Sequence, residues 1–221
     1  MLTLAVDAST STGSVAVVAG DRVLVEREVA MRGEHAERLM PAVADALRES
    51  GATAEQVERI VCGAGPGSFT GLRIAASIAK GLAVGWSVPL LAVPSPLLMI
   101  AGAPATADSG RYLAVLDAMR GDVFASCYEL HEDGGAVEVA APALIPRSEV
   151  AHMAASHAAR VMGPGEPINA VPRARGVARL RCWLAERECR VDMARWEPDY
   201  GRHAEAQVRW EAAHGRPLPG G

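Results

Sequence analysis

The sequence predicts an α/β fold with mixed sheets and flanking helices. Three consecutive strands joined by short turns are predicted in residues 2–30, and helical periodicity begins only after them. A purely parallel sheet needs a crossover after each strand, so this opening run excludes one. The 221 residues, of which 50% are hydrophobic and 22% charged, have the composition of an ordinary globular protein. This length allows one large domain or two small ones.

The first three strands are expected to form an antiparallel meander. Residues 2–8 and 14–19 are mainly apolar runs, and residues 22–30 alternate in character. The links at residues 9–13 and 20–21 have the length of hairpin turns.

Helices and one further strand follow the meander. An apolar stripe predicts a helix over residues 35–50, which Gly51 ends, and residues 53–56 have the spacing of a capping box. Residues 59–64 are predicted as a buried strand and residues 70–86 as a second long helix. This order of elements resembles that of the ribonuclease-H-like core, which actin-like ATPases duplicate. We therefore predict an actin-like ATPase fold of two such lobes.

The second half has weaker patterns, which indicates a degenerate second lobe. Paired strands are predicted at residues 112–117 and 123–130, and helices at residues 149–159 and 177–187. The apolar, proline-containing stretch 89–100 and the polar stretch 105–110 mark a seam between the halves. The predicted domains are an N-terminal actin-like lobe over residues 1–103 and a smaller C-terminal lobe over residues 104–221.

Charge and cysteine content limit the function classes. The net charge is -4, which argues against a uniformly basic face that grips nucleic acid alone. The Cys-x-x-Cys spacing is typical of zinc knuckles and redox sites, and no pair among the four cysteines has it. This cysteine content fits a reducing cytosol. No apolar run reaches the roughly 18 residues of a membrane span, and the start lacks the basic region of a signal peptide. We expect a cytoplasmic protein without membrane contact.

A glycine-rich link leads from the strand at residues 59–64 into the second long helix. It lacks the Gly-Lys-Ser/Thr ending of a Walker loop and is one residue too long for the dinucleotide fingerprint. Its backbone N–H groups could bind an anion, while the alternative is a rigid turn with Ser68 or Thr70 as N-cap. The glycine-rich turn comprises Gly65, Pro66, Gly67, Ser68, Phe69, Thr70, Gly71 and Arg73.

Two hairpins resemble the phosphate-binding hairpins of actin-like enzymes. The first has a carboxylate at the end of a strand followed by hydroxyl residues, and the second has a single glycine where two are usual. The alternative for the first is a turn in which hydroxyls bond locally. A nucleotide-sealing loop has one weak candidate, at residues 163–167. We expect vestigial hairpins that do not bind ATP tightly; their residues are Asp7, Ser9, Thr10, Asp117 and Gly121.

Searches for a metal site and a nucleophile give no candidates. His152 and His157 are five residues apart, which on a helix points them about 140° from each other, and His35 has no second histidine at i+4. No arrangement suggests a catalytic triad. We therefore expect no catalytic residue and no metal site in this chain.

The helix at residues 71–86 is apolar on nearly all sides, so it must be covered on both sides. One internal core could do this, and an intersubunit bundle with the preceding helix is the alternative. Under the second interpretation, the partner interface contains His35, Leu39, Met40, Val43, Leu47, Leu72, Ala75, Ala76 and Ala79.

Four motifs resemble those of one family. They are residues 63–73, the Asp7-x-Ser9-Thr10 start, residues 35–41 and the segment at residues 117–121. Through them the chain is similar to the TsaB family, also called YeaZ, over residues 1 to about 130. A weak echo follows at residues 198–206, where Gly201 departs from the family's usual Tyr-Leu-Arg, and residues 131–195 match poorly.

This resemblance implies a noncatalytic subunit with two actin-like lobes. Its partners would be the catalytic paralog TsaD, the ATPase TsaE and, through their complex, tRNA. The complex moves a threonylcarbamoyl group from threonylcarbamoyl-AMP to N6 of the adenosine 3' of the anticodon. ATP and divalent metal would be used by the partner subunits, with no cofactor in this chain. The catalytic paralog carries paired histidines on its first helix, where this chain has only His35; a homodimer of the isolated chain stays open.

Two other function classes remain open. A free-standing ATP-dependent kinase of the actin-like fold is favoured by Asp7 and Asp117 and disfavoured by the absent glycine pair. A tRNA-binding module is favoured by the preference for arginine, since Lys80 is the only lysine. Aromatic residues at 4% and an acidic balance count against it.

Overall fold

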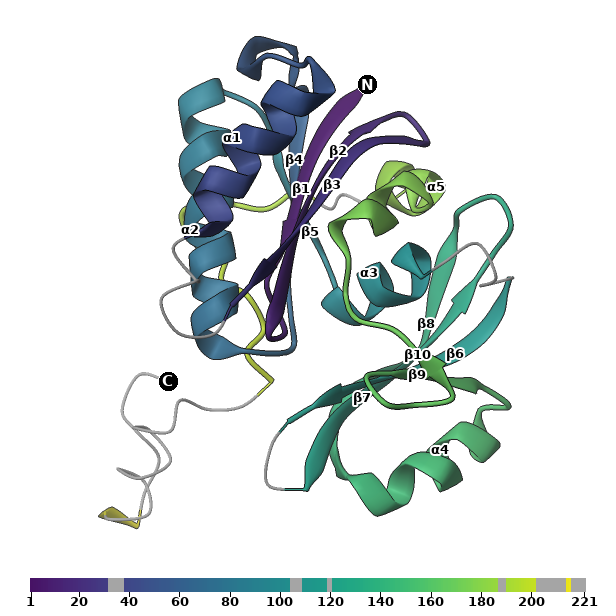
Figure 1. The fold of residues 1–221 in the computed structure, drawn as a ribbon. Helices are drawn as coiled ribbons and strands as arrows, with labels where there is room; N and C mark the ends of the chain where they lie inside the picture. The colour runs from purple at the N-terminus through teal and green to yellow at the C-terminus, as the bar shows by residue number, and fades with distance from the viewer. Residues whose placement is uncertain (32–37, 104–108, 119–120, 187–189, 202–213, 216–221) are drawn as a thin grey trace.

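The computed structural model of the chain describes residues 1–31, 38–103, 109–118, 121–186, 190–201 and 214–215. In these residues the strands form two five-stranded sheets, in the orders β3-β2-β1-β4-β5 and β10-β9-β6-β7-β8 (Figure 1). Each sheet mixes antiparallel with parallel pairs. The predicted α/β class with mixed sheets is therefore confirmed.

The first sheet begins with the expected antiparallel meander and ends with parallel strands. A hairpin at Gly20, which has a φ of 64°, joins the second strand to the third. The strands are β1 (Leu2–Asp7), β2 (Thr12–Ala19), β3 (Arg22–Ala30), β4 (Arg59–Gly63) and β5 (Leu90–Val93). β4 pairs parallel to β1 and to β5, so helices must connect them.

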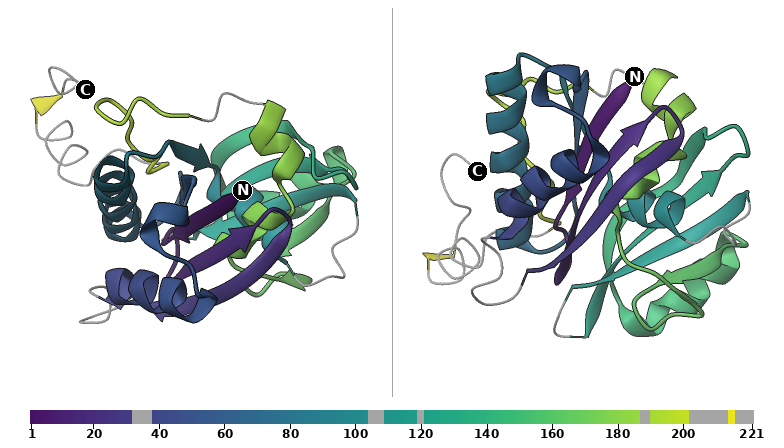
Figure 2. Two further views of the ribbon diagram at one scale, coloured as in Figure 1. Left: turned by 90° about the horizontal axis from the view of Figure 1, so that it is seen from above. Right: turned by 45° about the horizontal axis from the view of Figure 1, so that its top comes forward.

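Helices cover both faces of this sheet. α1 (Leu39–Ser50) and α2 (Phe69–Trp86) pack on one face, and α3 (Ser95–Gly102) packs on the other. Successive strand residues supply the two faces: Leu4 and Val6 join the core under α1 and α2, and Ala5 joins the core around α3. Figure 2 shows α1 and α2 on the side of the first sheet away from the second sheet.

The second sheet packs against α3 through one face and carries α4 (Val150–Ser156) on the other. A single core therefore runs from the first sheet through α3 to the second sheet. The strands are β6 (Gly110–Asp117), β7 (Asp122–Leu130), β8 (Ala136–Pro146), β9 (Arg160–Gly163) and β10 (Ile168–Asn169).

The apolar stretch 89–100, expected to mark part of the seam, contains β5 and most of α3. α3 is buried along its whole length, so it has no amphipathic period by which sequence reasoning could find it. Its prolines are compatible with the helix because they lie at its start, where no N–H donor is lost from the helical ladder. The predicted helix over residues 177–187 is also corrected: a 3-10 turn, η4 (Ala174–Ala178), precedes the shorter α5 (Arg181–Glu186).

After β10 the chain returns to the first sheet. η4 packs against α3 and β2, and Nη1 of its residue Arg175 lies 3.5 Å from Oε2 of Glu26 on β3. Farther along, Val191 N donates a hydrogen bond of 3.0 Å to Leu90 O on β5. Part of the predicted C-terminal lobe thus packs on the first sheet, and the boundary at residues 103 and 104 stays a prediction. No described helix is long and apolar enough to span a membrane.

Candidate functional site

Asp7, at the end of β1, is completely buried and fully engaged within the chain. Its Oδ1 accepts hydrogen bonds from Ser9 N at 3.0 Å and Ser9 Oγ at 2.8 Å, and its Oδ2 accepts one from Ser95 Oγ at 2.6 Å. Ser95 in turn accepts a hydrogen bond from Gly65 N at 3.1 Å. A side chain at Gly63 would lie 1.8 Å from Asp7 Oδ2, so only glycine fits there. The carboxyl group therefore ties β1, α3 and the glycine-rich turn together.

Burial raises the pKa of Asp7, because the charged form loses its hydration; the hydrogen bonds from Ser95 and Ser9 act in the opposite direction. A carboxylate that binds Mg²⁺ in a phosphate site must face water and the ion. Asp7 instead faces donors of its own chain, so its surroundings do not fit a metal–nucleotide group.

The hydroxyl residues of the first hairpin bond within the hairpin. Thr10 Oγ1 donates to Thr12 O at 3.0 Å and accepts from Thr12 N at 3.2 Å. Ser9 O accepts a hydrogen bond of 2.7 Å from Ser68 N, in the glycine-rich turn. This is the local bonding pattern expected for a hydroxyl-rich turn. The hydroxyl donors of Ser9 and Thr10 are therefore used inside the protein rather than presented to a phosphate.

The glycine-rich turn packs directly on that hairpin. Side chains at Gly67 and Gly71 would lie 2.2 Å from Ser9 O and 2.0 Å from Ala8 O. Ser68 caps α2 by accepting a hydrogen bond from Gly71 N at 3.3 Å, so the N-cap is Ser68 and not Thr70. The glycines therefore permit a close backbone contact, which supports the interpretation as a rigid turn.

The segment at residues 198–201, near the C-terminus, packs against the glycine-rich turn. Asp199 N donates a hydrogen bond of 2.8 Å to Ala64 O, and the rings of Tyr200 and Phe69 lie 4.6 Å apart. Gly201 has a φ of 65°, and a side chain there would lie 2.4 Å from Phe124 on β7. Sequence reasoning noted this segment only as a weak echo, although Gly201 marks the contact with the second sheet. Residues 202–206 of the echo lie outside the described residues.

The second hairpin joins β6 to β7 as predicted. Asp117 ends β6 at an exposed position, and Gly121 has a φ of 89° with open space around it. Gly121 O accepts a hydrogen bond of 3.0 Å from Arg147 N. The other loop singled out, residues 163–167, begins with the last residue of β9 and continues as the link to β10.

Within the described residues, no group of three or more histidine, cysteine or acidic side chains could hold a metal ion. His152 lies on α4, His157 directly follows it, and His35 falls outside the described part. Burial strongly raises the pKa of Cys62, so this thiol stays protonated and is no nucleophile at neutral pH.

The residues expected at a partner interface lie mostly in the chain's own core. This corrects their placement, because a side chain packed inside the protein cannot meet a partner. Met40 is 42% exposed and Leu47 is half-buried, while His35 lies outside the described residues. The buried ones are Leu39, Val43, Leu72, Ala75, Ala76 and Ala79. The first of the two interpretations, an internal core, accounts for them.

The opposite side of α2 is exposed and formed by small residues. Ser77, Gly81 and Gly85 follow each other at intervals of four residues, so they share one helix face with Val84, which is 64% exposed. A Cβ atom at Gly81 or Gly85 would meet nothing within 4 Å. We call these four residues the α2 face. Sequence reasoning treated the helix as apolar on nearly all sides and did not separate this i, i+4 row of small residues from the buried side.

Comparisons with known proteins find matches to more than half of this chain. Residues 27–172 match the family model described as "TsaD: tRNA N6-adenosine threonylcarbamoyltransferase". The chain is 38% identical over 134 residues to the tRNA threonylcarbamoyladenosine biosynthesis protein TsaB of Escherichia coli (strain K12), covering 61% of this chain and 58% of that protein. It is 34% identical over 129 residues to the TsaB protein of Bacillus subtilis (strain 168), covering 58% and 56%. The match thus spans less than two thirds of these curated relatives.

Solved structures from Pseudomonas aeruginosa extend the match to the whole fold. One, described as an uncharacterized protein with similarity to peptidase YEAZ, is 30% identical, has a TM-score of 0.77 and covers 91% of this chain and 99% of that chain. Another, described as YeaZ, is 29% identical with a TM-score of 0.75 and coverage of 90% and 99%. The two sheets with their flanking helices therefore form the predicted actin-like fold.

Proposed function

The chain belongs to the TsaB (YeaZ) family, and from this premise we propose that it acts in tRNA threonylcarbamoyladenosine biosynthesis as a noncatalytic subunit. The catalytic paralog TsaD would transfer the threonylcarbamoyl group from threonylcarbamoyl-AMP to N6 of the adenosine 3' of the anticodon. This chain would bind and support TsaD in the cytoplasm. ATP and divalent metal would be used by TsaD and the ATPase TsaE, and tRNA would be reached through the complex.

The observation that carries the noncatalytic role is the enclosure of Asp7. An actin-like enzyme needs this carboxylate and the adjacent hairpin for metal and phosphate. In this chain the carboxylate is occupied by Ser9 and Ser95, and the hairpin is in contact with the glycine-rich turn. A kinase role would require all of these contacts to break before nucleotide could bind.

The α2 face supports the partner-binding role. Small residues let the backbone of another helix approach closely, and the neighbouring Ile74, Ile78 and Leu82 are partly exposed apolar side chains. Specific interfaces bury about 1,600 Å² in total, with a few central residues carrying most of the energy. We propose that the α2 face lies at the centre of the contact with TsaD, with Met40 of α1 contributing beside it. The same face would mediate a homodimer of the isolated chain.

Reconstitution tests this function. Purified TsaD and TsaE, with threonylcarbamoyl-AMP supply and tRNA, are assayed for tRNA threonylcarbamoylation with and without this chain. The proposal expects modification to depend on the chain and the chain to co-purify with TsaD. The proposed role would be contradicted if tRNA were modified equally well without this chain, or if the chain did not co-purify with TsaD.

A further inference from the structure

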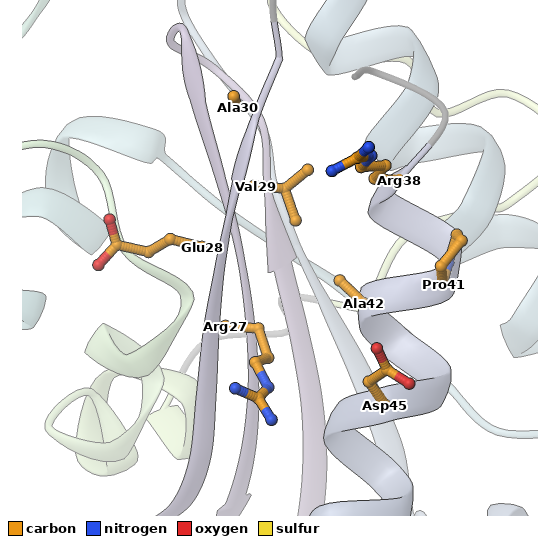
Figure 3. A pocket seen from close by; sticks show the side chains of 8 residues that line it. All are labelled: Arg27, Glu28, Val29, Ala30, Arg38, Pro41, Ala42 and Asp45. Carbon is orange, nitrogen blue, oxygen red and sulfur yellow. The ribbon is translucent and has the colours of Figure 1, made fainter. Parts of the chain in front are cut away.

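A groove lies between the outer strand of the first sheet and α1, away from the α2 face. It has a volume of about 710 Å³ and opens to solvent. Val29 on β3 and Ala42 on α1 form its apolar floor, Arg27 lies on the strand side, and Arg38 and Asp45 lie on the helix side (Figure 3). The groove therefore combines an apolar floor with charged walls.

The strand side of the groove is the edge of a sheet. β3 pairs with β2 on one side, and no described strand pairs with its other side. Met31 N donates a hydrogen bond to Ser11 O on the β2 side. Because every second residue of an antiparallel strand bonds to its partner strand, Val29 is also hydrogen-bonded to β2, whereas the residues on either side of Val29 are not. The N–H and C=O groups of Glu28 and Ala30 consequently point outward, to the open edge. An edge of this kind can pair with an added strand.

Among the described residues around the groove, one cation has no ion-pair partner. Asp45 forms an ion pair of 2.7 Å with Arg48, Arg27 pairs with Glu49, and the Glu28 side chain turns away from the groove to pair with Arg173. Arg38 has no ion-pair partner among the described residues, and Figure 3 shows its guanidinium extending toward Val29. The Arg38 guanidinium thus lies at the groove, beside the strand whose outer edge is open among the described residues.

We propose that this groove binds an extended acidic segment of a protein partner, which adds to β3 as a further strand. Its backbone would pair with Glu28 and Ala30, an apolar side chain would rest on Val29 and Ala42, and a carboxylate would meet Arg38. A slot between an edge strand and a helix is a general mode of peptide recognition, in which backbone hydrogen bonds provide affinity and side-chain pockets provide specificity. The proposal does not depend on the proposed function, because it uses a different surface and needs no modification assay.

Fluorescence anisotropy with the full chain tests the groove. The probe is a fluorescein-labelled peptide of about eight residues, the length of an ordinary strand, with alternating valine and threonine and two glutamates. We expect saturable binding that weakens about tenfold for Arg38→Gln and for a peptide with glutamine in place of glutamate. Arg195→Gln, at a side chain 90% exposed elsewhere, is the matched control and should bind as wild type does.

Two further arms test the added strand itself. Ala30→Pro removes an outward N–H group without touching the ladder to β2, and N-methylation of alternate peptide residues blocks the peptide's side of the pairing. Both should abolish binding; the peptide arm decides the question if Ala30→Pro does not fold. The proposal is overturned if the peptide does not bind, or if its binding is unchanged by both Arg38→Gln and N-methylation. A dimer in sedimentation velocity that Ala30→Pro abolishes would also overturn it, since a second copy would then occupy the edge.

Discussion

Ser95 Oγ lies 2.6 Å from Asp7 Oδ2, although the two residues are 88 positions apart in the chain. Ser95 stands at the start of α3, where it also accepts a hydrogen bond from Gly65. One hydroxyl thus joins the end of β1, the glycine-rich turn and the helix that separates the two sheets. The residue that the sequence assigns to a vestigial phosphate hairpin is therefore part of the framework of the fold.

The enclosed Asp7 predicts that the isolated chain does not bind ATP with micromolar affinity in the presence of magnesium. Calorimetric titration of the wild-type chain measures this directly. Asp7→Ala should leave the titration flat and instead lower the free energy of unfolding by about 1–3 kcal/mol, because buried donors lose their acceptor. Micromolar binding that disappears in Asp7→Ala would favour a kinase.

Asp7 also predicts a pH dependence of stability. Its pKa is raised in the folded state, so the folded protein holds the proton more tightly than the unfolded chain does. The contribution of Asp7 to stability is therefore fully present below the unfolded pKa of 3.8 and is lost as pH rises through the raised folded value. Urea unfolding across this range should show the wild-type free energy of unfolding falling relative to that of Asp7→Asn, which cannot titrate. A wild-type free energy of unfolding that rises with pH relative to that of Asp7→Asn would contradict the account.

The glycine-rich turn predicts a strong effect of Gly67→Val. The new side chain would meet Ser9 O at 2.2 Å, so the hairpin must move, at a cost of about 1–3 kcal/mol in the free energy of unfolding. Gly81→Val, where nothing lies within 4 Å, is the matched control and should change stability by less than about 0.5 kcal/mol. A Gly67→Val protein that is fully stable and partner-bound but inactive in tRNA modification would mean that the turn contacts a ligand.

The two sides of α2 predict opposite outcomes for the same new side chain. Ala76 is 6% exposed, so Ala76→Arg places a charge in the core and should unfold the protein or cost about 3 kcal/mol or more. Gly81→Arg adds a good helix former on the open side and should leave the thermal midpoint unchanged or raised. Circular dichroism during heating compares the two. Equal destabilisation by both would mean that the exposed face has been misplaced.

Local patterns predicted the parts of the fold that depend on neighbours in sequence. Hairpin-length turns identified the meander, and the capping box at residues 53–56 is confirmed by the hydrogen bond of 2.9 Å from Thr53 N to Gln56 Oε1. α3 was not predictable, because a helix buried on all sides has no apolar period. The partner of Asp7 was equally hidden, since no local signal connects positions so far apart in the chain.

The interface prediction failed on residues such as Ala76 for a related reason. Alanine and glycine lie on both sides of α2, so hydrophobicity does not separate the buried side from the open one. Only the position of the sheet distinguishes Ala76, in the core, from Ser77, one residue farther along and exposed.

The affinity of Gly81→Arg for the TsaD subunit tests the central claim most directly. Calorimetric titration compares it with wild type, and tRNA threonylcarbamoylation is assayed on the same samples. A desolvated charge at the centre of an interface costs about 2 kcal/mol or more, so the account predicts a dissociation constant at least about thirtyfold higher, with modification reduced in parallel. A folded Gly81→Arg protein that binds TsaD as tightly as wild type and supports full modification would contradict it.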